Sequence, residues 1–482
     1  MTHIFIDSSI RIKRSSCIDE LIPDIKTIFC HGNPKFYKIR AMGFSTREIA
    51  PKINIYAIEN EFIVFPRGCL NTICKLLNDN NIEYQITDNR FKSNPISVSL
   101  KPTVENREYQ TVVIKQLRKK SQQILVGPTG SGKTVVILRL LSELKQPTLI
   151  ITQTSILFKQ WLDEIDKYLQ YDFNVGQIGN GVHKTGPITV AMMQTLMRMD
   201  EKEWNAINSY FGMIVNEECH HTPALENFKV MNHLKAHYRY GITATLKRKD
   251  QLEFLTYATM SKNIINIDEN NPEVKNKRIS PIAFFIDDKN VTLEGESYLD
   301  DKFEEVESLP LWVDMIEIIT ENERRNQHII DEILLDLKQN HFVLVLTDRV
   351  AHCIALHKMF PNKKIAVPLI GNFKSAVKEK IKKNAKEGKI KVIFATRTLV
   401  GEGFDVPRLS SLHLVTPSNN SGMLQQLVGR VSRKMEGKDN AIVKDYVDTN
   451  SKYLVRMAKK RATYYKKMGV SLGGIDAISK KI

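Results

Sequence analysis

The eight residues GPTGSGKT at positions 127–134 limit the possible folds of this chain more than any other stretch. They fit the phosphate-binding pattern G-x-x-x-x-G-K-[ST] at every fixed position. Apolar runs at 124–126 and 135–138 flank them, so the loop lies where a strand gives way to a helix, which is the setting that the motif requires. The pattern therefore predicts a nucleotide-binding α/β domain.

Each residue type in this loop has a defined task in phosphate binding. The glycines let backbone N–H groups close around the phosphates, and the following helix directs its positive end at them. We expect Lys133 to neutralise the β- and γ-phosphates of the nucleotide and the Thr134 hydroxyl to ligate Mg²⁺. The predicted nucleotide-binding residues of the loop are Gly127, Pro128, Thr129, Gly130, Ser131, Gly132, Lys133 and Thr134.

Lysine and arginine outnumber the acidic residues by 70 to 54, which gives the chain a formal net charge of +16. This balance favours a polyanionic partner, most often nucleic acid, although a generally basic surface would produce the same count. The six cysteines include no C-x-x-C pair, so we expect reduced thiols in an intracellular protein, with neither zinc nor disulfides. No run of about 18 apolar residues and no signal-peptide pattern is present, so we expect a cytoplasmic protein with no membrane partner.

Hydrophobic patterning divides the 482 residues into four parts. Residues 1–100 mix short β-like runs with one amphipathic stretch, which predicts a small α+β domain. Strand-like and helix-like stretches alternate over 101–271 and again over 272–450, as in α/β domains with parallel sheets, and a basic helical tail follows at 451–482. A polar linker at 266–278 separates the two α/β series. Their predicted strands are 124–126, 148–152, 188–192, 211–215, 282–286, 342–346, 365–369, 392–395, 412–415 and 442–446.

Two acidic residues directly follow the predicted strand at 211–215, at the strand end where parallel sheets place their ligands. We expect Glu217 to hold Mg²⁺ through water and Glu218 to polarise the water that attacks the phosphate. His220 would connect this catalytic site to its surroundings by hydrogen bonding. A solvated acidic strand end is the alternative.

With these features in this order, the chain resembles the superfamily 2 helicases of the DExH kind. Their upstream R-x-Y-Q signature is matched at 107–110, their motif Ia at 152–160, and their motif III at 241–245. Motif V is matched at 395–407, and motif VI, Q-x-x-G-R-x-x-R, at 426–433. The resemblance implies two tandem RecA-like parallel-sheet domains that bind ATP and Mg²⁺ in the cleft between them.

The resemblance also implies roles for residues outside the loop. Arg430 and Arg433 would act as catalytic arginine fingers, together with Gln426 of the same motif, because a planar guanidinium suits the spread charge of a transferring phosphoryl group. A surface salt bridge is the alternative for these arginines. The further residues implied for ATP binding are Arg107, Gln110, Gly403 and Asp405. The implied contacts to the nucleic-acid backbone are Thr152, Thr154, Gln194, Thr195 and Thr396.

The chain departs from the family pattern at two positions. Motif II normally begins with Asp, and this chain has Glu217, whose extra methylene moves the carboxylate about 1.5 Å further from the backbone. This change puts the rate of hydrolysis in question. Leu246 replaces the usual Pro of motif III, which we regard as mild.

Short stretches narrow the resemblance to one branch. Residues 319–326 and 443–448 resemble the XPB-like and UvsW-like helicases. Residues 33–36, 53–56 and 66–68 resemble the small module that precedes the motor in phage UvsW-type enzymes, where it engages branched or distorted duplex. The resemblance implies fork or junction branch migration and dissociation of D-loops or R-loops in replication, recombination or repair, in a bacterial or phage-infected cell. The basic residues of this module that could contact phosphates, or form a solvated face, are Lys35, Lys38, Arg40, Arg47, Lys52 and Arg67.

Three other functions remain compatible with the same motifs. A duplex translocase could displace transcription or other complexes from DNA, and motif chemistry does not separate DNA from RNA helicases. If Glu217 weakens turnover, the chain could be an ATP-regulated nucleic-acid binding module. No nuclease signature is present in the sequence.

Overall fold

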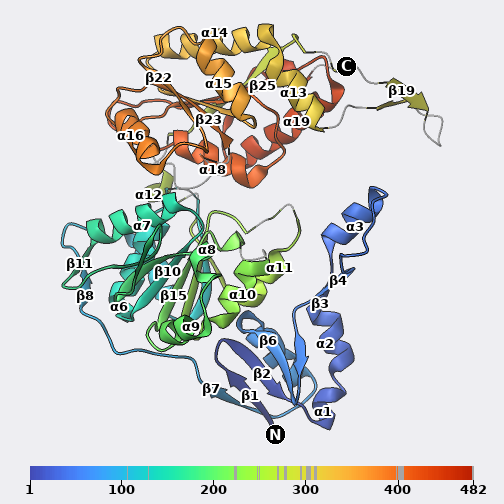
Figure 1. Cartoon of the computed structure of the whole chain (residues 1–482), viewed down its shortest axis with the longest axis vertical. Coiled ribbons are helices and arrows are strands. Elements are labelled where there is room, and N and C mark those ends of the chain that lie inside the picture. Colours follow the sequence, from blue (N-terminus) through green and yellow to red (C-terminus); the bar gives the residue numbers. More distant parts are fainter. Residues whose placement is uncertain are drawn as a thin grey trace. The chain divides into compact units, whose positions relative to one another are not determined.

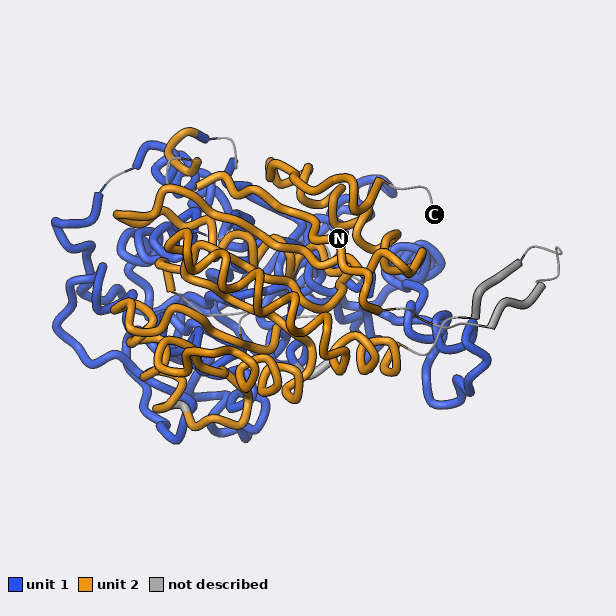
Figure 2. Tube along the Cα trace, turned by 90° about the horizontal axis from the view of Figure 1, so that it is seen from above, with its two compact units in different colours: residues 1–271 blue, residues 272–482 orange. Residues whose placement is uncertain are grey.

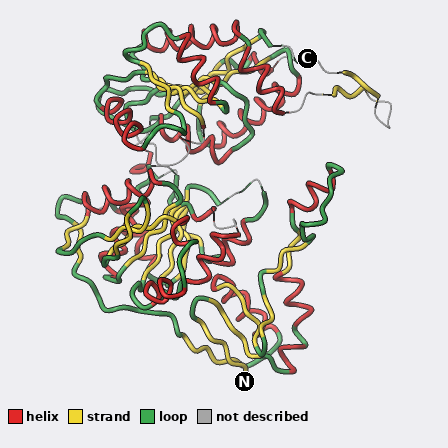
Figure 3. Tube along the Cα trace, in the orientation of Figure 1, coloured by secondary structure: helices red, strands yellow, loops and turns green. Residues whose placement is uncertain are grey.

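The protein is described by a computed structural model covering all positions except 106, 129, 222–224, 247, 249, 269–270, 276–278, 292, 294–295, 300–304, 309–311, 398, 400–405 and 480–482. The chain forms two compact units, residues 1–271 and 272–482, coloured separately in Figure 2. Helices and strands alternate through both units (Figure 3). The division between them falls within the polar stretch 266–278.

The first unit begins with a five-stranded sheet in the order β5-β6-β2-β1-β7. Four of these strands, β1, β2, β6 and β7, are labelled in Figure 1. Side chains alternate between its faces, so every second residue of β1 and β2 is buried, among them Ile4 and Ile6 of β1. The predicted small α+β domain is confirmed. Its strands are β1 (Thr2–Ile6), β2 (Ser9–Lys13), β5 (Ala57–Glu59), β6 (Phe62–Pro66) and β7 (Tyr84–Asp88), and its helices are α1 (Ser16–Asp19), α2 (Ile22–Phe29) and α4 (Leu70–Asp79). An extension between α2 and β5 holds β3 (Cys30–Gly32), α3 (Pro34–Ala41) and β4 (Lys52–Asn54).

Arg67 fastens this small domain to the rest of the first unit. Its buried guanidinium donates to the carbonyl oxygens of Ala236 (2.6 Å) and His237 (3.1 Å). The next residue, Gly68, lies so close to the helix that follows motif III that an added Cβ would stand 2.1 Å from the carbonyl oxygen of Tyr257. The prediction that Arg67 contacts phosphates is therefore wrong, because its donors already serve buried backbone acceptors.

The first α/β domain is an eight-stranded sheet in the order β13-β12-β14-β10-β15-β16-β9-β17, parallel except for the edge strand β13. Its strands are β9 (Gln122–Val126), β10 (Thr148–Thr152), β12 (Gly176–Gly179), β13 (Val182–Lys184), β14 (Ile188–Met192), β15 (Met213–Glu217), β16 (Tyr238–Thr243) and β17 (Ile264–Asn266). A short pair, β8 (Val98–Leu100) and β11 (Leu169–Tyr171), lies beside it. Its helices are α5 (Glu108–Leu117), α6 (Lys133–Leu144), α7 (Ser155–Tyr168), α8 (Met193–Leu196), α9 (Glu201–Asn208), α10 (Leu225–His233) and α11 (Glu253–Thr259). The central strands are buried on both faces, as expected for a parallel sheet covered by helices.

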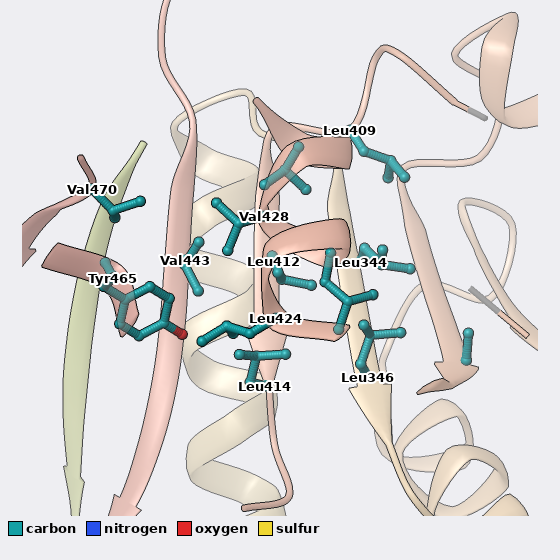
Figure 4. Close-up of a cluster of buried hydrophobic side chains, with 14 of the residues drawn as sticks. Leu344, Leu346, Leu409, Leu412, Leu414, Leu424, Val428, Val443, Tyr465 and Val470 are labelled. Atoms are coloured by element: carbon teal, nitrogen blue, oxygen red, sulfur yellow. The ribbon is translucent and has the colours of Figure 1, made fainter. Parts of the chain in front are cut away.

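The second unit holds a seven-stranded, fully parallel sheet in the order β22-β23-β21-β24-β25-β18-β26. Its strands are β18 (Ile282–Asp288), β21 (Val343–Thr347), β22 (Ala366–Leu369), β23 (Val392–Thr396), β24 (Ser411–Leu414), β25 (Ile442–Asp448) and β26 (Ser471–Gly473). Its helices are α12 (Pro272–Lys275), α13 (Trp312–Glu321), α14 (Glu323–Lys338), α15 (Val350–Met359), α16 (Ser375–Lys386), α18 (Ser421–Val431), α19 (Lys452–Lys467) and α20 (Asp476–Ser479), and a hairpin joins β19 (Glu296–Leu299) to β20 (Glu305–Ser308). Leu344, Leu412 and Val443 from three neighbouring strands pack against Leu424 and Val428 of α18 (Figure 4). The predicted pair of tandem parallel-sheet domains is therefore confirmed.

The basic segment after Ser451 is an integral part of this second domain. Helix α19 carries Arg461, whose buried guanidinium binds the Asp445 carboxylate of β25 at 2.7 and 2.8 Å, and Tyr465 donates to the same carboxylate at 3.0 Å. The chain then adds β26 as an edge strand parallel to β18. Sequence reasoning predicted the helix but not this strand.

Candidate functional site

The phosphate-binding loop joins β9 to α6, as its motif requires. Gly130 and Gly132 have φ values of 82° and 76°, in the left-handed region that favours glycine. An added Cβ at Gly132 would lie 2.8 Å from the amide nitrogen of Gln110. The Lys133 ammonium donates to the carbonyl oxygen of Gly127 at 2.7 Å. The loop therefore has the glycine geometry and the helix start that a phosphate cradle needs; the predicted residue Thr129 lies outside the described residues.

The R-x-Y-Q signature packs directly against this loop. Tyr109 donates its hydroxyl to the carbonyl oxygen of Ser131 at 2.7 Å, and Gln110 donates to the Tyr109 hydroxyl at 3.3 Å. The amide oxygen of Gln110 is buried without a hydrogen-bond partner among the described residues. A buried acceptor without a partner favours a ligand with an N–H donor, such as the adenine amino group. Arg107 is the N-cap residue of α5, beside the same loop.

The two candidate catalytic carboxylates have different surroundings. Glu217 is the last residue of β15, is 8% exposed, and accepts a hydrogen bond of 3.0 Å from the indole N–H of Trp161 on α7. Glu218 follows with a φ of 49°, a left-handed conformation that is uncommon for a residue other than glycine. Strained backbone of this kind persists only where its surroundings hold it, and it is frequent at active sites.

Glu218 belongs to a network that joins motif II to motif III. The Thr243 hydroxyl, at the end of β16, lies 3.1 Å from the Glu218 carboxylate and 2.9 Å from His220 Nδ1, which is itself 3.1 Å from that carboxylate. Burial acts to raise the pKa of Glu218, but the His220 and Thr243 hydrogen bonds and the nearby Lys133 charge outweigh it and lower the pKa to about 2. Glu218 is therefore ionised at neutral pH. His220 lies within hydrogen-bonding distance of both motifs, and its role in coupling the site to its surroundings stays a prediction.

Arg248 completes this network on the other side of His220. Its guanidinium donates to the backbone carbonyl of His220 and to the Asp250 carboxylate, the latter at 2.5 and 2.8 Å. Motif III is therefore held by charge-assisted hydrogen bonds at both ends. Thr243 bonds the Glu218 carboxylate at one end, and Arg248 bonds the Asp250 carboxylate and the His220 carbonyl at the other.

The predicted nucleic-acid contacts of the first domain lie where β10 and β14 end side by side. Thr154 is the N-cap of α7, its hydroxyl accepting from Leu157 N, and the exposed Gln194 donates to the carbonyl oxygen of Gln153 at 2.8 Å. Thr195, next to it on α8, is partly exposed. Thr152 is different: it is completely buried, and its hydroxyl donates to the Ala191 carbonyl oxygen. The Thr152 hydroxyl is thus turned into the domain in this structure, and its contact with nucleic acid stays a prediction.

The predicted site residues of the second domain lie on two elements. Gln426 and Arg430 are on α18, and Arg433 follows its end; Arg430 is 8% exposed. Thr396 ends β23 and is buried. Gly403 and Asp405 lie outside the described residues.

Sequence reasoning missed one anchor beside Thr396. Arg397 is buried and donates to the Asp348 carboxylate at 3.0 Å and to the Thr416 hydroxyl at 2.8 Å. These bonds hold together the ends of three neighbouring strands. Its only signal was its place next to a motif residue.

Comparison with known proteins places these motifs in two families. Residues 103–248 match the family described as type III restriction enzyme, res subunit, and residues 325–435 match the helicase conserved C-terminal domain.

Among the described residues, no group of three or more His, Cys, Asp and Glu could hold a metal ion, and no helix is long and apolar enough to cross a membrane.

Three relatives illustrate the similarity. The chain is 27% identical to a probable helicase D10 of Escherichia phage T5 over 82% of each chain. It is 26% identical to the DNA 3'-5' translocase XPB2 of Sulfurisphaera tokodaii over 79% of this chain and 89% of the relative. It is 23% identical to the ATP-dependent DNA helicase uvsW of Enterobacteria phage T4 over 72% of this chain and 69% of the relative. The crystal structure of T4 UvsW aligns with a TM-score of 0.41 at 20% identity over 98% of both chains. With its P-loop, its motif II to motif III network and both helicase domains, the chain belongs to the superfamily 2 helicases, among relatives of the UvsW and XPB kinds, and is an ATP-dependent nucleic-acid helicase.

Proposed function

We propose that the chain is an ATP-dependent DNA helicase or translocase that remodels branched DNA, by branch migration of forks and junctions and by dissociation of D-loops or R-loops. One observation carries the proposal. A single helix, α7, begins at the predicted nucleic-acid contact Thr154 and two turns later holds the catalytic carboxylate Glu217 through Trp161. A shift of α7 on binding a DNA strand would therefore reach the ATP site directly.

Residues of the first domain have separate roles in the proposed hydrolysis of ATP. Lys133 neutralises the phosphates, and Thr134 together with Glu217 would hold Mg²⁺, since a hydroxyl and one carboxylate suffice when phosphate oxygens and waters complete the shell. Glu218, kept ionised by His220 and Thr243, orients the attacking water. ATP supplies the phosphoryl group, and Mg²⁺ supplies charge neutralisation at its oxygens.

The remaining residues of the site are assigned by their motifs. Arg430 and Arg433, supported by Gln426, stabilise the charge of the transferring phosphoryl group. Arg107 and Gln110 bind the adenine, and the buried amide oxygen of Gln110, which has no hydrogen-bond partner within the described part of the chain, supports this role. The motif V residues Gly403 and Asp405 would complete nucleotide binding.

The DNA substrate is supported by charge and by two relatives. A net charge of +16 favours a polyanion, and two of the compared relatives are a DNA translocase and a DNA helicase by name. Thr154, Gln194, Thr195 and Thr396 would contact the backbone of the DNA, so the motor should show little sequence preference and a steep dependence on salt. We further propose that it acts in the cytoplasm of a bacterial or phage-infected cell, because two of the compared relatives are phage helicases by name and source.

The proposal is tested by steady-state ATP hydrolysis with no nucleic acid, single-stranded DNA, linear duplex, a four-way junction, and RNA of matched length. We expect strong stimulation by DNA, greatest with the junction. Lys133→Ala should abolish hydrolysis and junction migration while DNA binding without ATP persists. Stimulation by RNA alone would make the chain an RNA helicase, and no hydrolysis with any polymer would make it an ATP-regulated binding module.

A further inference from the structure

The extension at residues 30–54, here named the finger, lies outside the core of the first unit. It consists of α3 held between the paired strands β3 and β4. Not one of its residues is buried, whereas the neighbouring helices α2 and α4 each place two residues in the core of the small domain. In Figure 1, α3 stands at the tip of a ribbon that runs out beyond α2. Core packing therefore does not account for the sequence of the finger.

The base of the finger is nevertheless well defined. Asn33 caps α3 by accepting from Lys35 N at 3.1 Å, and its side-chain amide donates across the base to the carbonyl oxygen of Ala50 at 2.8 Å. His31 stacks on Phe254 of α11, with ring centroids 4.2 Å apart and planes 26° apart. The finger is thus anchored to the helix that follows the Arg248–Asp250 pair of motif III.

The surface of the finger combines cations with apolar side chains. Five of its residues are basic and one is acidic: Lys35, Lys38, Arg40, Arg47 and Lys52 against Glu48. Tyr37, Met42 and Phe44 are 50%, 57% and 69% exposed. Exposed aromatic rings among lysines and arginines are the arrangement that binds a nucleic-acid strand, since bases stack on the rings and phosphates pair with the cations.

We propose that the finger is a binding site for unstacked nucleotides of a DNA strand, with Tyr37 and Phe44 stacking on bases and Lys38 and Arg40 pairing with phosphates. Fully stacked duplex offers no base faces to aromatic rings, so this surface favours positions where base stacking is interrupted, as at a branch point. The inference rests on the proposed function, because it supplies the substrate preference of that motor. The charge ratio of five to one argues for a polyanion as the occupant, and the two exposed rings argue for its bases.

The test uses two double variants of the full chain and one control. The first is Tyr37→Ala with Phe44→Ala, and the second is Lys38→Gln with Arg40→Gln. The control is Ile58→Ala, an apolar residue that is 46% exposed on β5 of the same domain. Fluorescence anisotropy without ATP measures the affinity for a four-way junction and for linear duplex of equal length at several salt concentrations. Because the replaced residues are unburied, all variants should keep the wild-type thermal unfolding curve and basal ATP hydrolysis.

The two double variants should differ in what they lose. The aromatic variant should bind the junction roughly tenfold or more weaker while duplex affinity changes by less than about twofold, since each stacked base contributes measurably to binding. The charge variant should weaken both substrates and reduce the salt slope by about two, near one for each cation removed. The control should match the wild type.

Three results would overturn the inference. The aromatic variant could bind the junction as the wild type does, or it could lose junction and duplex affinity equally. The wild type, but not the aromatic variant, could instead sediment with vesicles of phosphatidylglycerol while DNA binding is unchanged, which would make the finger a membrane-surface element. Failure here is separable from failure of the proposed function, because the latter is decided by DNA stimulation of wild-type ATP hydrolysis.

Discussion

The hydrogen bond between Trp161 and Glu217 makes the sharpest prediction about hydrolysis. The indole N–H reaches the carboxylate at 3.0 Å in a buried setting, and the family pattern has the shorter Asp at this position. Glu217→Asp would withdraw the carboxylate by about 1.5 Å, to roughly 4.5 Å from the indole nitrogen, which is beyond hydrogen-bonding reach. Trp161→Phe would remove the donor and keep an aromatic ring. The two variants therefore break the same bond from opposite sides.

The magnitude follows from the charge and burial of the pair. A hydrogen bond to a charged group contributes about 1.5–3 kcal/mol, and a loss of about 2 kcal/mol at the transition state slows a reaction roughly 30-fold. We therefore expect each single variant to lower kcat by about 10- to 100-fold and to raise the Mg²⁺ concentration needed for half-maximal rate. The double variant should be no slower than the slower single variant, which corresponds to a coupling of about 2 kcal/mol.

The assay is DNA-stimulated ATP hydrolysis at saturating DNA, titrated with Mg²⁺. Trp204→Phe serves as the matched control, because Trp204 of α9 stacks on His233, with ring centroids 5.2 Å apart, and not on a residue of motif II. Strictly additive costs in the double variant, or an unchanged Mg²⁺ requirement in Trp161→Phe, would refute the reasoning. Faster turnover by Glu217→Asp alone would refute it as well.

Three further predictions concern stability and pH. Arg67→Met should lower the stability of the first unit by about 3 kcal/mol, because it leaves buried carbonyl oxygens without donors, and a thermal scan that matches the wild type would contradict this. Arg461→Leu should destabilise the second unit by about 3–5 kcal/mol, because it leaves the buried Asp445 carboxylate charged with the Tyr465 hydrogen bond but without its ion-pair partner, and adding Asp445→Asn should recover part of the loss in hydrogen exchange of β25. The stabilisation from ionised Glu218 is complete above its ordinary pKa of 4.5 and is lost as the pH falls towards about 2. His220→Phe removes one cause of the low pKa, so the loss of stability should occur at higher pH in unfolding curves. Coincident curves for the variant and the wild type would exclude the network.

Much of the fold was predictable because its strands are buried on both faces. The predicted strands 148–152 and 188–192 coincide with β10 and β14, and 392–395 lies within β23. Continuous apolar runs bounded by turn residues mark such strands without any knowledge of their neighbours. The positions of the motif residues could be predicted from these strands, because each motif residue lies at a fixed distance in sequence from a strand end.

The sequence was less informative about which side chain at a strand end faces outward. Thr152 and Thr154 were equal candidates, yet Thr152 is still inside β10 and buried, while Thr154 lies two residues beyond the strand and caps α7. A shift of one or two residues changes the face or the exposure of a side chain, and strand ends cannot be predicted that finely. Arg67 was likewise predicted to be an exposed cation, because the sequence does not show which side chains the first α/β domain covers. In the structure it is buried between the small domain and that α/β domain.

By itself the sequence determined the nucleotide chemistry and the order of the domains. The phosphate-binding loop and the paired carboxylates depend on residues close together in the chain, so local spacing is enough to identify them. Only the tertiary structure decided that Trp161 supports Glu217, that Arg461 joins α19 to Asp445, and that residues 30–54 stay out of the core. These outcomes depend on contacts between residues that are far apart in the sequence. Such contacts form only when parallel strands pair and helices cover the sheet, and a local sequence pattern does not specify them.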